Sequence, residues 1–527
     1  MKRWRIQQIP PSIFYLCIMN ENRKVRVRFA PSPTGGLHLG GVRTALFNYL
    51  FAKKNGGDFI LRVEDTDQTR FVEGAEDYIN DCLKWCGIHP DESPLKEGEF
   101  GPYRQSERKA SYRAYAEKLV GEGKAYYAFD LPEELEAARE QSPNFTYGHS
   151  TRMKMKNSLS LPHAEVQALL EKGTPHVIRI KVPADETIQF TDMIRGVVTF
   201  ETNLVDDKVL LKADNMPTYH LAVVIDDHQM KISHIFRGEE WLPSAPIHIL
   251  LWECLGWKQE MPQWAHLPLI LKPDGPGKLS KRDGDRLGFP VFAMNWYDPK
   301  SGETTKGFRE MGFLPESFVN MLALLGWNDG SDQEIFSLEE LIEKFSLERI
   351  NNSGAKFDFE KAKWFNHEWI QRLSISDLSE HIHPILTSHH IDVETKYLET
   401  VVALVRDRLT FLTDFWDHAS FFFSKPEDYD LDAILKRWND EKITFFTNII
   451  ESLEAFEPWH SEELESFYKL AIQASGMKMG ELMLPLRIML VGGKFGPHVF
   501  DIVAALGKAE TIARIRRGLD VISASRS

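Results

Sequence analysis

Cysteine is scarce in this sequence. The 527-residue chain contains four cysteines, at positions 17, 82, 86 and 254. So few and so scattered thiols exclude a disulfide framework, which fits the reducing environment of the cytoplasm. Cys82 and Cys86 lie four residues apart in a segment with a helical pattern, where two thiolates could hold a metal ion. No further Cys or His pair at ligand spacing accompanies them, so we expect both to be buried core residues and no metal site.

Long apolar runs are also absent. No stretch reaches the roughly 18 residues that a transmembrane helix needs, so we expect no membrane-spanning segment. The first residues, MKRWRIQQIPPSIFYLCIM, combine basic residues with a short apolar run as a signal peptide does, but the small-residue cleavage site is missing. We therefore interpret residues 1–23 as a frayed N-terminal extension, with Met19 as an alternative start of translation.

The sequence has no excess of positive charge. Its formal net charge is −14, which does not by itself indicate a nucleic-acid partner, although a local basic face could still contact phosphates. The hydrophobic fraction of 43% and the charged fraction of 27% are ordinary for a globular protein. The length predicts three or more structural units.

What is present near the start is a turn built from Pro, Ser, Thr and Gly. The apolar run VRVRF (residues 25–29) predicts a strand. From Thr44 on, apolar residues recur at helical spacing, so APSPTGGLHLGG connects a strand to a helix. Main-chain N–H groups at such a helix start attract an anion, glycines let a phosphate come close, and His38 could donate a hydrogen bond to it. The turn matches neither the Walker pattern nor the dinucleotide pattern, and alone His38 is more simply interpreted as a cap of the helix.

A second cluster, KLSKR (residues 278–282), lies in a polar loop rich in Gly, Pro and Asp that we expect to follow a strand. Its two lysines and one arginine could surround a polyphosphate and stabilise the charge on a leaving group. Alone, such a cluster is usually a solvated surface patch. The pairing with the first turn favours function, because the two motifs belong to opposite halves of one predicted nucleotide-binding sheet.

Strand and helix patterns alternate near the N-terminus, which indicates a doubly wound parallel sheet. They include a helix near residues 75–85, and strands at YHLAVVIDDH (219–228) and ISHIFRG (232–238) resume the sheet after an insertion. Amphipathic segments beyond residue 370 predict an all-helical end. The expected divisions are an N-terminal extension (1–23), the first half of a Rossmann-like domain (24–103), an inserted domain (104–212), the second half (213–283), a mixed region (284–370) and a helical region (371–527).

Together these motifs resemble those of a known family. APSPTGGLHLG with KLSKR is similar to the signature of class I aminoacyl-tRNA synthetases, and RFAPSPTG, RVEDTD, GPYRQSER, PTYHLA and VIDDH match glutamyl-tRNA synthetases of the bacterial type. GFLPESFVNMLALLGW and FDFEKAKWFN extend the resemblance, which covers residues 24–520. It implies an α/β fold: a Rossmann-like parallel-sheet catalytic domain with an inserted acceptor-stem-binding domain, followed by an all-α anticodon-binding C-terminal region.

The resemblance implies a glutamate–tRNA ligase, which activates L-glutamate with ATP to glutamyl-adenylate and transfers it to the 3′-terminal adenosine of tRNA-Glu. ATP would be a substrate, with Mg²⁺ bridging its phosphates. The implied catalytic residues are His38, Lys278 and Lys281, within an ATP site made of His38, Gly40, Glu240, Ile270, Lys278, Ser280, Lys281 and Arg282. The implied glutamate site comprises Arg28, Ala30, Ser32, Glu64, Tyr219, Val223 and Arg237.

The chemistry of these residue types agrees with the implied glutamate site. Arginine suits a substrate carboxylate, as implied for Arg28 and Arg237, while Glu64 would hold the α-amino group. Without the resemblance, an exposed strand residue is the simpler interpretation of Arg28 and an N-cap that of Glu64. Val223 stands where some relatives carry asparagine, so only its backbone could line the amino-acid pocket.

The sequence also departs from some relatives. They hold a zinc ion in the inserted domain through a Cys-x-Cys motif, whereas this chain has AYYAFD there, so we expect no structural zinc. The stretch at 284–307 is longer than expected, and its role stays open. Arg408 aligns with an arginine that favours tRNA-Glu over tRNA-Gln anticodons. We expect a cytoplasmic monomer without membrane contact, whose partners are tRNA-Glu, L-glutamate and ATP.

Three alternatives stay open at this point. A glutamyl transferase that modifies a tRNA base shares the catalytic half but lacks the helical region. A small-molecule nucleotidyltransferase shares a similar histidine turn but has no need of RVEDTD. A non-catalytic tRNA-binding relative is disfavoured by the intact set of His38, Lys278, Ser280 and Lys281.

Overall fold

The computed structural model describes residues 13–15, 23–142 and 145–525. The chain forms two compact units. The N-terminal unit runs to Phe308 and includes Phe318–Phe359, whereas the C-terminal unit comprises Arg309–Ser317 and the chain from Glu360 on. Cys17 and the alternative start at Met19 lie outside the described residues.

A parallel sheet forms the centre of the N-terminal unit. Strand β2 (Arg26–Phe29) pairs with β3 (Asp58–Leu61), and β9 (His234–Gly238) pairs with β10 (Gln263–Leu267), both in parallel. Ser233, just before β9, joins the two pairs, because its backbone N–H donates to the carbonyl of Arg26 and its hydroxyl accepts from the Arg26 N–H at 2.7 Å. The strand order β3-β2-β9-β10 is that of a doubly wound fold, as the sequence predicts.

Strand β6 (Thr187–Asp192) extends this sheet beyond β10 and in turn pairs with the antiparallel strand β7 (Gly196–Glu201). Both lie inside the range predicted for the insertion (104–212), and the structure shows them paired into the central sheet. The sequence could not reveal this pairing, because Asp192 faces Trp264 across the sheet from a distant part of the chain. Residues Ile13–Tyr15 form β1, a further parallel strand beside β6, so this part of the predicted extension is ordered into the sheet.

Helices cover the sheet and carry parts of the cavity described below. Helix α1 (Leu39–Lys54) connects β2 to β3, and α2 (Ala75–Trp85) follows with the bounds that the sequence predicts. Residues 219–228, predicted as a strand, are instead the helix α6 (Tyr219–Gln229), which is followed by α7 (Ala245–Cys254). The prediction was wrong because Leu221–Asp227 are all buried, so the apolar run shows no helical periodicity.

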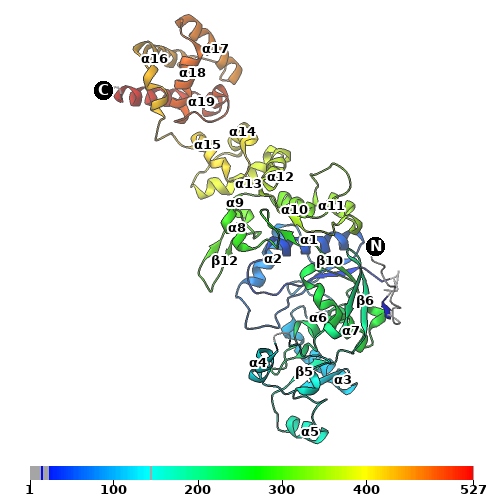
Figure 1. Cartoon of the computed structure of the whole chain (residues 1–527). Coiled ribbons are helices and arrows are strands. Elements are labelled where there is room, and N and C mark those ends of the chain that lie inside the picture. Colours follow the sequence, from blue (N-terminus) through cyan, green and yellow to red (C-terminus); the bar gives the residue numbers. More distant parts are fainter. Residues whose placement is uncertain (1–12, 16–22, 143–144, 526–527) are drawn as a thin grey trace, which may run out of the picture. The chain divides into compact units, whose positions relative to one another are not determined.

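The remaining part of the insertion contains a second, smaller sheet, whose core is continuous with that of the central sheet. Strands β4 (Ala125–Ala128), β5 (Val177–Ile180) and β8 (Val209–Leu211) form an antiparallel sheet. Helices α3 (Lys109–Gly121), α4 (Pro132–Gln141) and α5 (His163–Glu171) accompany it, and Figure 1 shows these elements gathered at one end of the N-terminal unit.

The chain after the sheet consists of short elements. Strand β11 (Ile270–Leu271) pairs with β14 (Ala355–Lys356), and β12 (Trp296–Tyr297) forms a hairpin with β13 (Thr304–Thr305). The polar loop expected around KLSKR is partly helical, because α8 (Lys281–Leu287) begins directly after Ser280. The short helices of this region are α9 (Phe308–Met311), α10 (Pro315–Leu324) and α11 (Leu338–Lys344).

The C-terminal unit is helical, as the amphipathic pattern predicts. Its helices are α12 (Phe359–Arg372), α13 (Ile375–Ser388), α14 (Thr395–Val405), α15 (Asp414–Phe423), α16 (Asp440–Glu454), α17 (Ser461–Ser475), α18 (Met479–Val491) and α19 (Val499–Ala524). They share one apolar core. Buried Arg514 ties three of them together, since its guanidinium donates to the carbonyls of Phe421 and Leu490. Within the described parts of the chain, no helix has the length and apolar character that crossing a membrane requires.

Candidate active site

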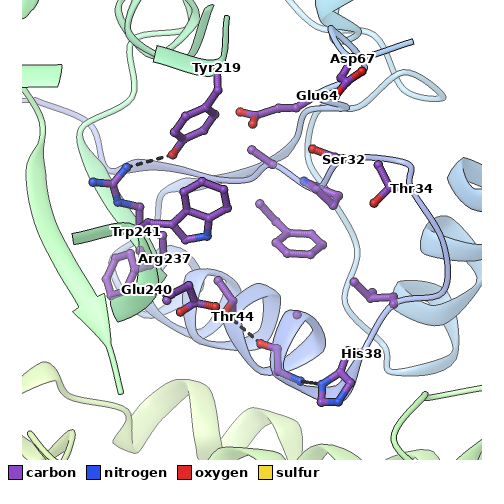
Figure 2. Close-up of a pocket in the computed structure, with 18 of the residues that line it drawn as sticks. Ser32, Thr34, His38, Thr44, Glu64, Asp67, Tyr219, Arg237, Glu240 and Trp241 are labelled. Carbon is purple, nitrogen blue, oxygen red and sulfur yellow. Dashed lines mark hydrogen bonds between the residues drawn. The ribbon is translucent and has the colours of Figure 1, made fainter. Parts of the chain in front are cut away.

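A cavity of about 1100 Å³ lies at the carboxyl ends of the parallel strands. Its walls come from the turn after β2, the segment after β3, the end of β9, the segment after β10 and the start of α6. Ligand sites of open α/β sheets occupy this edge because the strand order reverses there. Figure 2 shows Tyr219 and Arg237 on one side of the cavity, His38 at the N-terminus of α1 and Thr44 one turn further along that helix.

His38 is the N-cap of α1, and its Nδ1 accepts a hydrogen bond from the Gly40 N–H at 3.2 Å. Burial, together with the nearby Lys278 cation, lowers the pKa of His38 to about 4, so the imidazole is neutral at physiological pH. Because Nδ1 is the acceptor, the proton resides on Nε2, which is buried and has no hydrogen-bond partner in the described part of the chain. The helix-capping and ligand-binding interpretations of His38 are therefore compatible, since they use different ring nitrogens.

The glycines of the turn serve different purposes. A Cβ on Gly36 would lie 2.7 Å from Cγ of Trp296, so this residue permits close packing of an indole rather than of a ligand. Gly40 lines the cavity, and a Cβ on it would meet no atom closer than 3.7 Å. The approach of a phosphate predicted for the glycines is thus sterically open at Gly40, at the N-terminus of α1.

The KLSKR segment reaches the same cavity from the opposite half of the sheet. Lys278 and Ser280 line it, as do Ile270 and Glu240, and Lys278 Nζ donates to Glu240 Oε1 at 2.5 Å. Ser280 caps α8, because its hydroxyl and backbone N–H both donate to the Asp283 carboxylate. Lys281 and Arg282 occupy the first turn of α8 and are not among the residues that line the cavity.

A buried charge network supports the other end of the cavity. Arg28 Nε donates to Asp227 Oδ1 at 3.0 Å, and fully buried Arg62 donates to the same oxygen at 2.7 Å. Arg62 also donates to Glu64 Oε1 at 3.0 Å. Burial raises the pKa of Glu64, while the flanking arginines oppose that shift. Arg28 and Glu64 both line the cavity and are buried, so the interpretations of Arg28 as an exposed strand residue and of Glu64 as an N-cap are wrong.

Arg237 is a buried cation with no carboxylate partner among the described residues. Its Nη1 donates to the Tyr219 hydroxyl at 3.0 Å, and its Nε donates to His266 Nε2 at 2.9 Å. Its Nη2 is buried without a hydrogen-bond partner in the same described part. Burial therefore lowers the pKa of Arg237 from its ordinary value, although the group stays charged.

Asp192 and His266 orient this guanidinium. His266 Nδ1 donates to Asp192 Oδ2 at 2.6 Å, which leaves Nε2 as the acceptor that Arg237 requires. Neither residue could be identified from the sequence, since nothing in their spacing links β6 to β10. Three further residues of the site were not predicted. Arg62 and Asp227 lie within the RVEDTD and VIDDH motifs, and Trp241 packs against Tyr219 with 4.9 Å between ring centroids.

The other predicted residues are placed as follows. Ala30 and Ser32 line the cavity. Val223 is buried in α6 and is not among the lining residues. Arg408 belongs to the C-terminal unit, where it is exposed in a short 3-10 turn, Arg406–Arg408. Cys82 and Cys86 are buried, as predicted. No group of three or more His, Cys, Asp or Glu side chains suited to a metal ion occurs in the part of the chain that the structure describes.

The fold and the cavity define a class I tRNA synthetase. The family model for the catalytic domain of class I tRNA synthetases (E and Q) matches residues 24–364, and that for an anticodon binding domain matches residues 377–519. Glutamate–tRNA ligases of Phocaeicola vulgatus and Flavobacterium johnsoniae are 53% and 51% identical, each over 95% of this chain and at least 99% of their own length. This chain belongs to the glutamate–tRNA ligase family.

Solved structures agree with this assignment. A crystal structure of a glutamate tRNA ligase from Elizabethkingia meningosepticum, in complex with its amino acid, matches with a TM-score of 0.90 at 48% identity, over 95% of this chain and 100% of its own. A glutamate–tRNA synthetase from Elizabethkingia anophelis matches with a TM-score of 0.86 at 47% identity, over 94% of this chain and 100% of its own. The predicted fold class and ligase activity are confirmed in preference to the three alternatives.

Buried histidines make the stability of the N-terminal unit depend on pH. Burial lowers the pKa of His38, His220 and His234 to about 4 each. Below pH 6.5 the unfolded chain therefore binds protons that the folded chain does not. The free energy of unfolding falls by up to about 1.4 kcal/mol per pH unit for each such histidine. We expect the urea midpoint of this unit to fall between pH 7 and pH 5, and the fall to be shallower in His234→Gln. A midpoint that stays constant over this range would contradict the burial of neutral histidines.

Proposed function

We propose that glutamate and ATP react in the cavity at the carboxyl edge of the sheet. The observation that carries this proposal is Arg237, a buried guanidinium with one unpartnered nitrogen and no carboxylate partner among the described residues. Arg28 and Arg62 donate to the carboxylates of Asp227 and Glu64, whereas no carboxylate of the described residues contacts Arg237. The α-amino and α-carboxylate charges of an amino acid cancel each other. The guanidinium without a carboxylate therefore favours a substrate with an anionic side chain over its amide.

Within this arrangement, Arg237 and Arg28 bind the side-chain carboxylate of glutamate. Arg28 donates to Asp227 through Nε and Nη2, and its Nη1 remains for the substrate. Tyr219 fixes Arg237 and lines the same end of the cavity. Glu64, held by Arg62, accepts from the α-ammonium group, while Ala30 and Ser32 complete the wall of the amino-acid site. Val223 lies behind this wall, in α6.

Adenylate formation then needs alignment and charge stabilisation. An oxygen of the substrate α-carboxylate forms a bond to the α-phosphorus of ATP, and the bond from that phosphorus to the pyrophosphate oxygen breaks. The neutral imidazole of His38 donates from Nε2 to a phosphate oxygen beside the N-terminus of α1. Lys278 stabilises the departing pyrophosphate from the cavity wall, and Lys281 and Arg282 do so from the adjoining first turn of α8. Gly40, Ser280, Ile270 and Glu240 complete the nucleotide site.

Magnesium would assist as a counter-ion of the phosphates. Mg²⁺ is commonly held by substrate phosphates and water together with one or two carboxylates, and Glu240 lines the nucleotide end of the cavity. The acyl group next passes to a ribose hydroxyl of the terminal adenosine of tRNA-Glu. We propose that Arg408 reads the anticodon, that the enzyme works as a cytoplasmic monomer, and that no structural zinc is required.

The activity is tested by glutamate-dependent ATP–pyrophosphate exchange. We expect exchange with glutamate in the presence of tRNA-Glu. Glutamine should give none because its amide brings no negative charge to Arg237, and aspartate should give none because its side chain is one methylene shorter than that of glutamate. Comparison of tRNA-Glu with tRNA-Gln, in the native protein and in Arg408→Ala, tests anticodon discrimination. Exchange with no tRNA present would instead favour the chemistry of a modifying transferase.

Arg237→Ala should weaken the use of glutamate far more than that of ATP. Loss of a buried charged donor costs roughly 2–5 kcal/mol, so the KM for glutamate should rise on the order of a hundredfold or more. Arg237→Lys is the matched variant, since it keeps the charge and loses the planar donor pair. Steady-state exchange at saturating ATP measures both variants. An unchanged KM for glutamate in Arg237→Ala would contradict the assignment.

Lys281→Ala should slow adenylate formation with little change in the affinity for glutamate. Removal of one donor to a transition-state charge costs on the order of a hundredfold or more in rate. Lys300→Ala removes an exposed lysine from the loop between β12 and β13 and serves as the control. Exchange by Lys281→Ala at the native rate would remove the KLSKR segment from the mechanism.

A further inference from the structure

The stretch 284–307, whose role the sequence leaves open, passes directly behind the His38 turn. The backbone N–H of Leu39 donates to the carbonyl of Val291 at 2.8 Å, and His38 forms an antiparallel bridge with Phe292. The backbone of the first residue of α1 and of its cap is thus bridged to a segment that lies far along the chain. We call residues 289–296 the brace.

Aromatic side chains of the brace pack onto the turn itself. The Phe292 ring meets the His38 imidazole edge to face, with 6.3 Å between centroids. The Trp296 indole lies so close to Gly36 that any Cβ there would clash with it, which explains why this position needs glycine. On the other side of the brace, the Tyr78 hydroxyl donates to the carbonyl of Met294 at 2.5 Å and accepts from the Met294 N–H at 3.3 Å.

The brace is also continuous with the helix that carries the cationic motif. Helix α8 starts after Ser280 and ends at Leu287, and the left-handed backbone of Gly288 then turns the chain directly into the brace. A Cβ on Gly284 would lie 2.7 Å from the Phe289 carbonyl oxygen and from a Val291 methyl group, so helix and brace are closely packed. The chain that follows the brace is fixed to it as well, because the Phe308 N–H donates to the carbonyl of Phe292 at 3.0 Å.

We propose that the brace is a positioning element that sets the orientation of the His38 imidazole and holds α8, with Lys281, at a fixed place relative to it. The proposal rests on the proposed role of His38 in binding the phosphates of ATP. The two signature motifs come from opposite halves of the sheet, and phosphoryl transfer requires their donors to be aligned at one phosphate. One short backbone segment that pairs with the first motif and continues from the second provides that alignment. Phe292 is a positioning residue, because it acts through His38.

The test is a double-mutant cycle on ATP–pyrophosphate exchange with the full chain, glutamate and tRNA-Glu. We expect Phe292→Ala to lower the rate about tenfold and raise the KM for ATP while the KM for glutamate stays constant, since a misplacement of about 1 Å can cost up to a hundredfold. Phe292→Leu should restore most of the rate, because it keeps the apolar cover of the imidazole. In a His38→Ala background, Phe292→Ala should have almost no further effect.

Each other outcome has a separate meaning. Native exchange by His38→Ala would overturn the proposed role of His38. If His38→Ala slows exchange but Phe292→Ala has no effect in the native background, the proposed role of the brace alone is overturned. The same holds if Phe292→Ala slows exchange by the same factor with and without His38. Phe336→Ala, which removes a buried ring that packs against Trp327 away from the cavity, is the control and should leave both KM values unchanged.

If Phe292→Ala fails to fold, Tyr78→Phe tests the same element from its other side. It removes only the hydroxyl that binds the Met294 backbone. We expect a fall in rate of about threefold with the same rise in the KM for ATP and an unchanged KM for glutamate. Native values of all three parameters in Tyr78→Phe would then overturn the proposal.

Discussion

The rest of the site depends on the buried contact between Arg62 and Asp227. Arg62 is completely buried, and a guanidinium there is tolerable only because Asp227 and Glu64 accept its hydrogen bonds. Asp227 in turn holds Arg28, so one carboxylate links a structural arginine to one that lines the cavity. Loss of one member of such a network leaves a buried charge unpaired, at a cost of roughly 3–5 kcal/mol. The network therefore stabilises the sheet edge and presents the amino-acid site.

The two ends of the cavity solve different electrostatic problems. At the amino-acid end, fixed carboxylates hold Arg28 and Arg62, whereas no carboxylate of the described residues contacts the Arg237 guanidinium. At the nucleotide end, the donors are a neutral imidazole, a helix N-terminus and lysines that remain partly exposed. The amino-acid end suits a small anion of defined shape, because a buried guanidinium would stay unpaired beside a neutral ligand. The nucleotide end suits a polyphosphate, whose charge changes position during the reaction.

Neutral histidines connect the fold to this chemistry. His266 can accept from Arg237 only while Asp192 holds its other nitrogen, and His38 can donate from Nε2 only while Gly40 occupies Nδ1. In both cases a backbone or carboxylate partner selects the tautomer, and burial keeps the ring uncharged. Asp192 comes from β6, the strand at the root of the insertion, so the substrate arginine is oriented by an element outside the motifs.

The α/β class, the helical C-terminal region and the two phosphate-binding motifs could be predicted from the sequence, because local turn chemistry and charged clusters involve consecutive residues. The family resemblance added twelve of the 32 residues that line the cavity. The sequence pattern misassigned α6, whose all-round burial hides the helical period, and gave no sign that β6 and β7 join the central sheet. The burial of Arg28 and Glu64, the orientation of Arg237 by His266 and Asp192, and the position of residues 289–296 behind His38 came from the tertiary structure alone. The physical reason is that these contacts join segments far apart in the chain, and neither pairing across a sheet nor burial of a charge leaves a periodic signal in sequence.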